Sequence, residues 1–185
     1  MIIGLTGTLC AGKGSVVELL KQKGFKHYSV RGFLIKEIEK RNLPIKIDSM
    51  VLVANDLREK NSPSYIVEQL YSEAKKKGKN CVIESIRAVG EIEALKSKGN
   101  FYLIAVNAPL ALRYSRMISR QSEIDNLTYD EFIEKEKRQM KSSNPNEQNL
   151  EKCIEMADFT IQNEKNFEYL QKQVDSIYEK IKNSN

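Results

Sequence analysis

Short runs of apolar residues alternate along the chain with longer segments in which apolar residues recur every three or four positions. The short runs are typical of buried strands, and the longer segments are typical of amphipathic helices. The predicted strands are residues 1–6, 25–30, 81–83, 101–106 and 159–161. The predicted helices are residues 15–22, 31–41, 49–59, 63–77, 91–98, 109–120, 128–140 and 167–181. Residues 141–149 are rich in Asn and Ser, which predicts a loop.

The alternation of strands and helices predicts an α/β fold in which helices cover both faces of a parallel sheet. The strand at 101–106 is the clearest, because six apolar residues follow one another there. No internal repeat or linker divides the chain, so we expect a single domain over residues 1–185. Ligands of such sheets bind at the carboxyl ends of the strands, so the candidate chemistry should lie in the loops that follow them.

The charge balance is mildly basic, with 30 Lys and Arg against 25 Asp and Glu and a formal net charge of +5. Most lysines stand among glutamates inside predicted helices, for example at 36–41 and 135–141, which favours solvated helix faces over a nucleic-acid footprint. No segment combines aromatic and basic residues as RNA-binding modules do. We therefore do not expect nucleic acid as a partner.

The remaining composition indicates the cellular setting. No apolar run reaches the roughly 18 residues of a membrane span, and the apolar start lacks a preceding basic segment and is broken by glycines, unlike a secretory signal. Cys10, Cys81 and Cys153 are far apart and lack the spacing of metal ligands. We expect a reduced cytoplasmic protein without a membrane partner, as a monomer or a homodimer.

The segment after the first predicted strand carries the clearest functional motif. The spacing Gly-x-x-x-x-Gly-Lys between a strand and a helix is that of a phosphate-binding P-loop, the Walker A motif. Gly7 and Gly12 can take backbone angles closed to other residues, so that the loop amides turn inward and bind an anion. Lys13 adds a positive charge for the β- and γ-phosphates, and we therefore expect ATP and Mg²⁺ as cofactors. The expected cofactor-binding residues are Gly7, Thr8, Leu9, Cys10, Ala11, Gly12, Lys13, Gly14 and Ser15.

A glycine-rich turn that binds nothing is the alternative interpretation, but the strand and the helix flank the loop in the required register. One departure from the Walker A pattern is informative, because Gly14 follows Lys13 and the hydroxyl comes only at Ser15. Gly-Lys-Gly-Ser resembles the Gly-Lys-Gly-Thr of adenylate kinases and related nucleoside monophosphate kinases. The resemblance implies that Mg²⁺ is held largely by water and phosphates, with Ser15 as a candidate metal residue.

The likeness to this kinase group extends over nearly the whole chain. The segments that carry it, besides the phosphate loop, are Ile3–Gly7, Tyr28–Arg31, Val53–Arg58, Val82–Arg87, Tyr102–Val106 and Ala157–Phe159. The sequence resembles the adenylate-kinase-related and dephospho-CoA-kinase-like branch of the P-loop nucleoside monophosphate kinases. This implies a three-layer P-loop NTPase fold with a five-stranded parallel sheet, acceptor-binding helices at about 31–77 and a short helical lid at about 116–140. It also implies a kinase whose partner is a nucleoside monophosphate or a similar small nucleotide.

The resemblance also assigns acceptor-binding residues. Ser29 and Arg31 match the start of the acceptor segment, although Arg31-Gly32 replaces the usual Gly-Asp and Ile35 replaces an expected arginine. Arg87 matches the arginine that binds the acceptor phosphate, for which a planar guanidinium is suited. Asn55 and Arg58 lie one helical turn apart and can face one cleft, or else form an exposed helix face.

Further candidates act on the transferred phosphate. Glu84 stands where the family has an aspartate acting on magnesium-bound water, so we expect a metal-binding and catalytic role, with a structural carboxylate as the alternative. Arg116 and Arg120 precede the polar segment 121–127 and are expected to close over the phosphate. Arg113 on the same stripe is expected to lie on a solvated face, and Arg138 could contribute from the next helix. The expected catalytic residues are Lys13, Glu84, Arg87, Arg116 and Arg120.

Two other functions remain open at this stage. The stretch from Asp158 to Asn163 resembles one near the end of dephospho-CoA kinases, which would make dephospho-CoA the acceptor. The altered acceptor segment around Arg31 is also compatible with a nucleotide-binding ATPase or regulator that has no metabolite acceptor.

Overall fold

The computed structural model describes residues 1–78, 80–120 and 127–183. Five strands form one parallel sheet: β1 (Ile2–Thr6), β2 (Lys26–Ser29), β3 (Cys81–Glu84), β4 (Phe101–Asn107) and β5 (Phe159–Gln162). Their order across the sheet is β2-β3-β1-β4-β5, and β1 at the centre pairs Leu5 with Glu84 on one side and with Ile104 on the other. This is the α/β P-loop fold that the sequence predicts.

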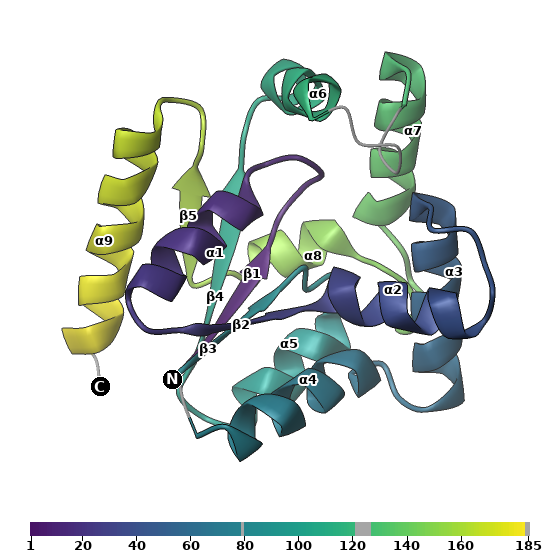
Figure 1. Cartoon of the computed structure of the whole chain (residues 1–185), viewed down its shortest axis with the longest axis horizontal. Helices are drawn as coiled ribbons and strands as arrows, with labels where there is room; N and C mark the ends of the chain where they lie inside the picture. The colour runs from purple at the N-terminus through teal and green to yellow at the C-terminus, as the bar shows by residue number, and fades with distance from the viewer. Residues whose placement is uncertain (79, 121–126, 184–185) are drawn as a thin grey trace.

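The described helices are α1 (Lys13–Gln22), α2 (Val30–Lys40), α3 (Ile47–Lys60), α4 (Tyr65–Lys76), α5 (Val89–Lys96), α6 (Leu110–Ser119), α7 (Tyr129–Met140), α8 (Leu150–Glu155) and α9 (Phe167–Asn183). One or more of them follow each strand along the chain, with α2 to α4 between β2 and β3 and α6 to α8 between β4 and β5 (Figure 1). In the described part of the chain, no helix combines the length and the apolar content needed to cross a bilayer.

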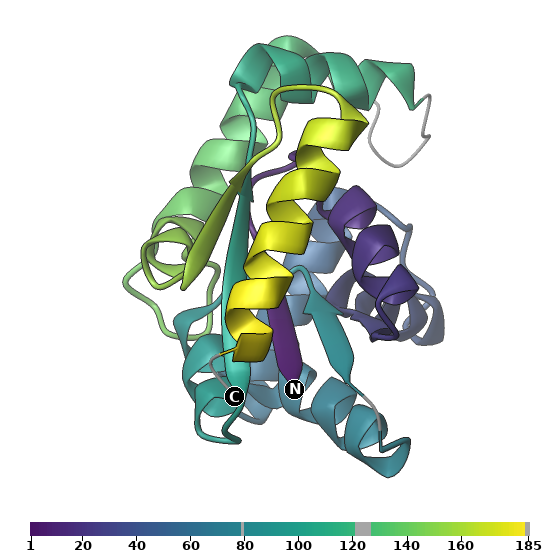
Figure 2. The ribbon, with the colours of Figure 1, turned by 90° about the vertical axis from the view of Figure 1, so that its left-hand side faces the viewer.

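Two apolar cores lie on the two faces of the sheet, because neighbouring strand residues point in opposite directions. Ile3 and Ile104 face α1 and α9, which lie side by side (Figure 2). Ile83 and Leu103 face the other layer, which contains α2 to α5 and α8. The helices α6 and α7 lie beyond the carboxyl ends of the strands, where the sequence predicts a lid (Figure 1).

Several element boundaries differ from the sequence prediction for local reasons. The predicted strand at 25–30 ends at Ser29, whose Oγ accepts a hydrogen bond from the Gly32 N–H (3.1 Å) and caps α2. The helix predicted from 63 begins at Tyr65, and the helix predicted from 91 begins at Val89. The helix α8 was not predicted. The predicted segment 121–127 lies outside the described residues except for Leu127.

Candidate active site

The loop between β1 and α1 has the backbone shape that the glycine motif predicts. Gly7 and Gly12 have φ angles of 127° and 99°, and Cys10 between them has a φ of 57°. A Cβ on Gly7 would lie 2.1 Å from the Val106 oxygen, and one on Gly12 would lie 2.0 Å from Asn163 Nδ2. Both positions therefore require glycine for space as well as for backbone conformation.

Lys13 begins α1 and turns back over its own loop. Its Nζ donates to the carbonyl oxygens of Gly7 and Thr8, both at 2.8 Å. Burial lowers the pKa of Lys13 to about 7, and the positive charge of Arg87 acts in the same direction, partly opposed by Glu84. An anion in the loop would stabilise the charged form of this lysine and so raise its pKa again.

Glu84 ends β3 next to the phosphate loop. Its Oε2 lies 3.2 Å from Nε2 of His27 on β2, a partner that no sequence motif indicated. Burial opposes ionisation, but the hydrogen bond with His27 and the charge of Lys13 outweigh it and lower the pKa of Glu84. The carboxylate is therefore ionised at neutral pH and is suitable as an oxygen ligand for Mg²⁺.

A protein-only metal site is not formed in the described residues, where no three His, Cys, Asp or Glu side chains come together as ligands. Ser15 is half-buried in the first turn of α1. Glu84 lines the pocket beside Lys13, whereas Ser15 is not among the described lining residues. The donor set present fits a cation held mainly by phosphates and water, with one carboxylate nearby.

Arg58 of α3, which the sequence predicts as an acceptor-binding residue, is almost completely buried. It is 1% exposed and its Nη2 lies 2.8 Å from Oε1 of Glu91, which is 0% exposed. The other oxygen of Glu91 accepts from the backbone N–H groups of Arg87 (2.9 Å) and Ala88 (3.1 Å) at the start of α5. The alternative of an exposed helix face is therefore wrong for Arg58. Asn55 is half-buried, with its Oδ1 3.5 Å from Arg58 Nη1.

Arg87 follows β3, and its guanidinium donates to the Gln139 side chain of α7. Burial lowers the pKa of Arg87, and the charge of Arg31 contributes further. Two guanidinium groups that disfavour each other's charge create a strong preference for an anion between or beside them. This crowding lies at the carboxyl end of the sheet, where the sequence predicts the acceptor phosphate.

The two arginines of α6 and Arg120, which caps its carboxyl-terminal end, have three different environments. Arg113 is buried, donates to the Ala108 oxygen (2.8 Å) and pairs with Glu136 of α7, so the expectation of a solvated face is wrong. Arg116 donates to the oxygens of Asn163 (2.9 Å) and Ala11 (3.4 Å), behind the phosphate loop. Arg120 contacts the loop on the pocket side, with Nη1 3.9 Å from the Cys10 sulfur, and both residues line the same pocket.

One pocket joins most of these groups and is called the central pocket below. Its cationic lining consists of Lys13, Arg31, Arg58, Arg87 and Arg120. Its apolar lining comes mainly from α2 and α3, with Val30, Leu34, Ile47, Met50, Val51 and Ala54. Glu84, Gln139 and Gln148 also line it, whereas Ser29, Asn55 and Arg116 are not among its described lining residues. Lysine, arginine and an apolar wall together suit an anion with an apolar body.

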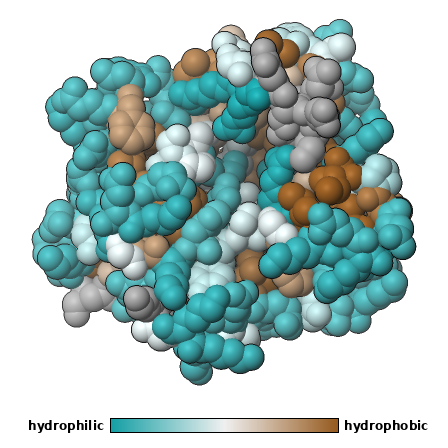
Figure 3. Space-filling model, viewed as in Figure 1, coloured by the Kyte–Doolittle hydropathy of each residue, from teal (hydrophilic) through white to brown (hydrophobic). Residues whose placement is uncertain are grey.

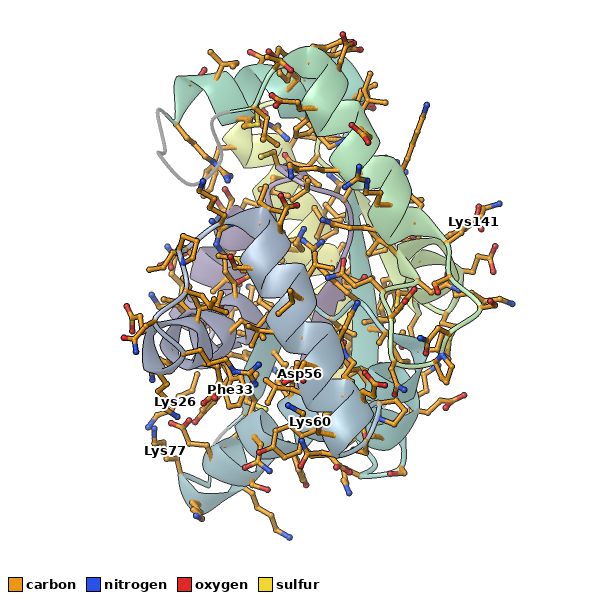
Figure 4. The ribbon with its side chains drawn as sticks, turned by 90° about the vertical axis from the view of Figure 1, so that its right-hand side faces the viewer. Lys26, Phe33, Asp56, Lys60, Lys77 and Lys141 are labelled. Atoms are coloured by element: carbon orange, nitrogen blue, oxygen red, sulfur yellow. The ribbon has the colours of Figure 1, made fainter. Side chains whose placement is uncertain are left out.

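A second hollow, the outer groove, lies between α3 and α7. Asn55 and Arg138 line it, so Arg138 lies outside the central pocket. Lys135 Nζ spans the two helices at 2.6 Å from Asp48 Oδ1. On the outer side of α3, Asp56 binds Arg41 of α2 (2.7 Å) and Lys60 (2.8 Å), which fixes the helix that presents Arg58 (Figure 4). Apolar surface gathers over the amino-terminal end of α3 in an otherwise largely hydrophilic face (Figure 3).

Comparison with known proteins identifies the family. A family model described as an AAA domain matches residues 3–141. The UPF0200 protein MJ1399 of Methanocaldococcus jannaschii is 30% identical over 187 residues, an alignment that covers 100% of this chain and 92% of the relative. The chain belongs to the UPF0200 family. Membership in this family specifies no acceptor.

Solved structures with low sequence identity share the fold of this UPF0200 protein. Shikimate kinase from Aquifex aeolicus has a TM-score of 0.53 at 18% identity, covering 100% of this chain and 98% of that one. Dephospho-CoA kinase from Campylobacter jejuni has a TM-score of 0.50 at 16% identity, covering 97% and 96%. The fold is therefore that of a P-loop kinase, and this likeness specifies neither an activity nor a substrate.

Proposed function

We propose that this UPF0200 protein is an ATP-dependent phosphotransferase that acts on a nucleoside monophosphate or a similar small nucleotide. The observation that carries the proposal is the central pocket, in which the phosphate-loop lysine Lys13 and the acceptor-side arginines Arg31, Arg58 and Arg87 line one space. Phosphoryl transfer needs the donor and the acceptor in line and needs their charges stabilised, and it requires little covalent chemistry from the protein.

The donor half of the site binds the phosphates of ATP. The loop residues 7–15 hold them, and Lys13 exchanges its bonds to the Gly7 and Thr8 oxygens for bonds to the β- and γ-phosphates. Mg²⁺ would be held by the phosphates, Glu84 and Ser15, partly through water, and would neutralise charge on the transferred group.

The acceptor half binds the second anion. Arg87 and Arg31 hold the acceptor phosphate, and Arg58 keeps Arg87 in place through its pair with Glu91. An oxygen of the acceptor phosphate forms the new bond to the γ-phosphorus while the bond to the β-phosphate oxygen breaks, and ADP leaves. A monophosphate oxygen is largely deprotonated at pH 7, so the transfer needs no general base.

Arg120 and Arg116, the arginines of the proposed lid, have different roles. Arg120 lines the central pocket and stabilises the charge of the transferred phosphoryl group. Arg116 braces the phosphate loop from behind through Ala11 and Asn163. Ser29 caps α2, which presents Arg31, so its contribution to acceptor binding is indirect.

The structure gives no specific support to dephospho-CoA as the acceptor. The stretch that carries that likeness runs from Asp158 to Asn163, and Asn163 supports the phosphate loop, which is the donor side of the site. Asp158 exchanges two hydrogen bonds with the Leu103 backbone, at 2.7 Å and 2.9 Å. Asp158 precedes β5 and so lies at the amino-terminal edge of the parallel sheet, opposite the central pocket. The residue joins β5 to β4 and does not reach the site.

The direct test measures ADP formation with Mg-ATP and a panel of ribo- and deoxynucleoside monophosphates, with dephospho-CoA in parallel. We expect one or more monophosphates to stimulate ADP formation and Lys13→Ala to abolish it. Slow hydrolysis that no acceptor changes would support the ATPase or regulator alternative instead. Full turnover by Lys13→Ala would rule out the assigned role of the phosphate loop.

A further inference from the structure

Glu84 has a neighbour to which the proposed function gives no role. His27, on the edge strand β2, places its Nε2 3.2 Å from Oε2 of Glu84. An ionised carboxylate can only accept a hydrogen bond, so His27 donates this one through Nε2. Glu84 lines the central pocket, whereas His27 is not among its described lining residues. His27 can therefore affect a ligand in the pocket only through the carboxylate that it holds.

The register of the sheet brings these two side chains together. His27 lies opposite Val82 in the parallel ladder, and Glu84 follows Val82 by two residues on β3. Side chains two residues apart on a strand point to the same face, so His27 and Glu84 both lie on the face of Val82, which packs against α1. Both partners stand on strands, which fix a side chain more precisely than loops do.

A glutamate at this position benefits from being held. The resemblance to nucleotide kinases places an aspartate here, and glutamate has one more rotatable bond, whose freedom is lost when the carboxylate binds a cation. The hydrogen bond from His27 already orders the carboxylate in the ligand-free protein. Burial opposes ionisation, but the hydrogen bond from His27 and the charge of Lys13 lower the pKa of Glu84 and so favour the form that a cation requires.

We infer that His27 is a positioning residue, which holds the Glu84 carboxylate ready for the Mg²⁺ that accompanies ATP. This inference rests on the proposed function. The side chains of His27 and Glu84 are 30% and 18% exposed, and a pair so close to solvent contributes little to stability. Loss of a residue that orients a metal ligand, by contrast, typically lowers metal affinity or activity by about 10–100-fold.

Nucleotide binding with and without Mg²⁺ tests the inference independently of turnover. The probe is the non-hydrolysable ATP analogue AMP-PNP, titrated calorimetrically into the protein with Mg²⁺ or with EDTA. His27→Leu should bind it as wild type does in EDTA, but should lose the gain in affinity with Mg²⁺ to the same extent as Glu84→Gln. His27→Gln should retain the gain, because its amide N–H can donate at a similar reach. Lys26→Leu, at an exposed position of the same strand, is the matched control and should also retain it.

Turnover shows whether His27 acts through Glu84. The kcat of His27→Leu should fall about 10-fold or more, with little change in the KM for the monophosphate and in the melting temperature. The double variant His27→Leu/Glu84→Gln should be no slower than Glu84→Gln alone, because the two residues act as one unit. A double variant about 10-fold slower than Glu84→Gln would contradict the positioning role.

The binding comparison decides the inference even without an acceptor. It is overturned if His27→Leu retains the gain in affinity with Mg²⁺, or if wild type shows no such gain. His27→Ala replaces the leucine variant if the latter does not fold. Wild-type protein that binds Mg-AMP-PNP but turns over no monophosphate overturns the proposed function, and the comparison of the His27 variants in Mg²⁺ and EDTA still determines whether His27 positions Glu84.

Discussion

Arg58 and Glu91 form an ion pair that is almost entirely removed from solvent, with 2.8 Å between Nη2 and Oε1. The same carboxylate caps α5 through the backbone N–H groups of Arg87 and Ala88. Removal of one partner from such a pair leaves an uncompensated buried charge, which is strongly destabilising. The pair therefore supports both the fold and the position of the proposed acceptor arginine.

Glu91→Ala should destabilise the protein by about 3–5 kcal/mol, because it leaves the Arg58 guanidinium buried without a counter-charge. Chemical denaturation followed by circular dichroism would measure the free energy of unfolding. Glu73→Ala is the control, since it breaks the exposed pair with Lys77 and should cost about 1 kcal/mol or less. If both variants lose the same free energy of unfolding, the buried pair contributes no more to stability than the exposed one.

Lys13 should make nucleotide binding depend on pH. Its pKa in the folded protein, about 7, lies below the ordinary value of 10.5, so between these values the unfolded chain binds the additional proton. Below pH 7 the folded protein contains the buried charged lysine, which lowers the free energy of unfolding by its full amount. As the pH rises from about 7 towards 10.5 the folded protein loses this charge, and the free energy of unfolding increases. Phosphate binding requires the charged lysine, so nucleotide binding above pH 7 should take up a proton, and affinity should fall as the pH rises.

Calorimetry with Mg-ATP at pH 8, in buffers of different ionisation enthalpy, measures this proton uptake directly. Lys13→Met should remove the uptake together with most of the affinity. Binding heats at pH 8 that do not depend on the buffer would contradict the lowered pKa.

The glycines at positions 12 and 14 should respond oppositely to alanine. Gly12→Ala places a Cβ 2.0 Å from Asn163 Nδ2 at a φ of 99°, so it should destabilise by at least about 1–2 kcal/mol. Gly14→Ala meets no atom within 4 Å and lies in the first turn of α1, so it should be neutral or stabilise by up to about 1 kcal/mol. Thermal unfolding of the two variants side by side measures the difference. A stable Gly12→Ala protein would be inconsistent with the loop geometry.

Arg120→Ala should lower kcat by about 10³-fold or more, since an arginine that contacts the transferred phosphoryl group commonly contributes that much. The KM values should change less, because the contact forms mainly in the transition state. Arg138→Ala is the control, since Arg138 lines the outer groove and pairs with Glu134 at the surface. Equal kcat values for Arg120→Ala and wild type would remove Arg120 from the proposed mechanism.

The sequence predicts the scaffold well because its signals are local. The apolar strands and the glycine motif are read within a few residues of one another, and the five strands and the phosphate loop are present as predicted. The sequence does not predict helix α8, because a segment of six residues is too short to show helical periodicity. Asn149 is nevertheless a residue typical of a helix N-cap.

The environment of individual side chains was harder to predict because it depends on distant partners. Arg58 appeared equally suited to an exposed face, since Glu91, which buries it, lies on another helix. Arg113 appeared to be one of a solvated stripe for the same reason, with Glu136 supplied by α7. Gln148 stood in a polar loop whose composition gave no indication that its amide is enclosed.

The hydrogen bond from Asn163 Nδ2 to the Ala11 oxygen (2.8 Å) ties the phosphate loop to the far end of the chain. During synthesis the glycine motif leaves the ribosome early, but Asn163, which supports it, lies about 150 residues further along the chain and leaves later. A nascent or truncated chain that stops before β5 thus carries the whole motif without its brace. Nucleotide capture should accordingly begin only after Asn163 has been synthesised, so nucleotide binding would report that folding has reached the end of β5.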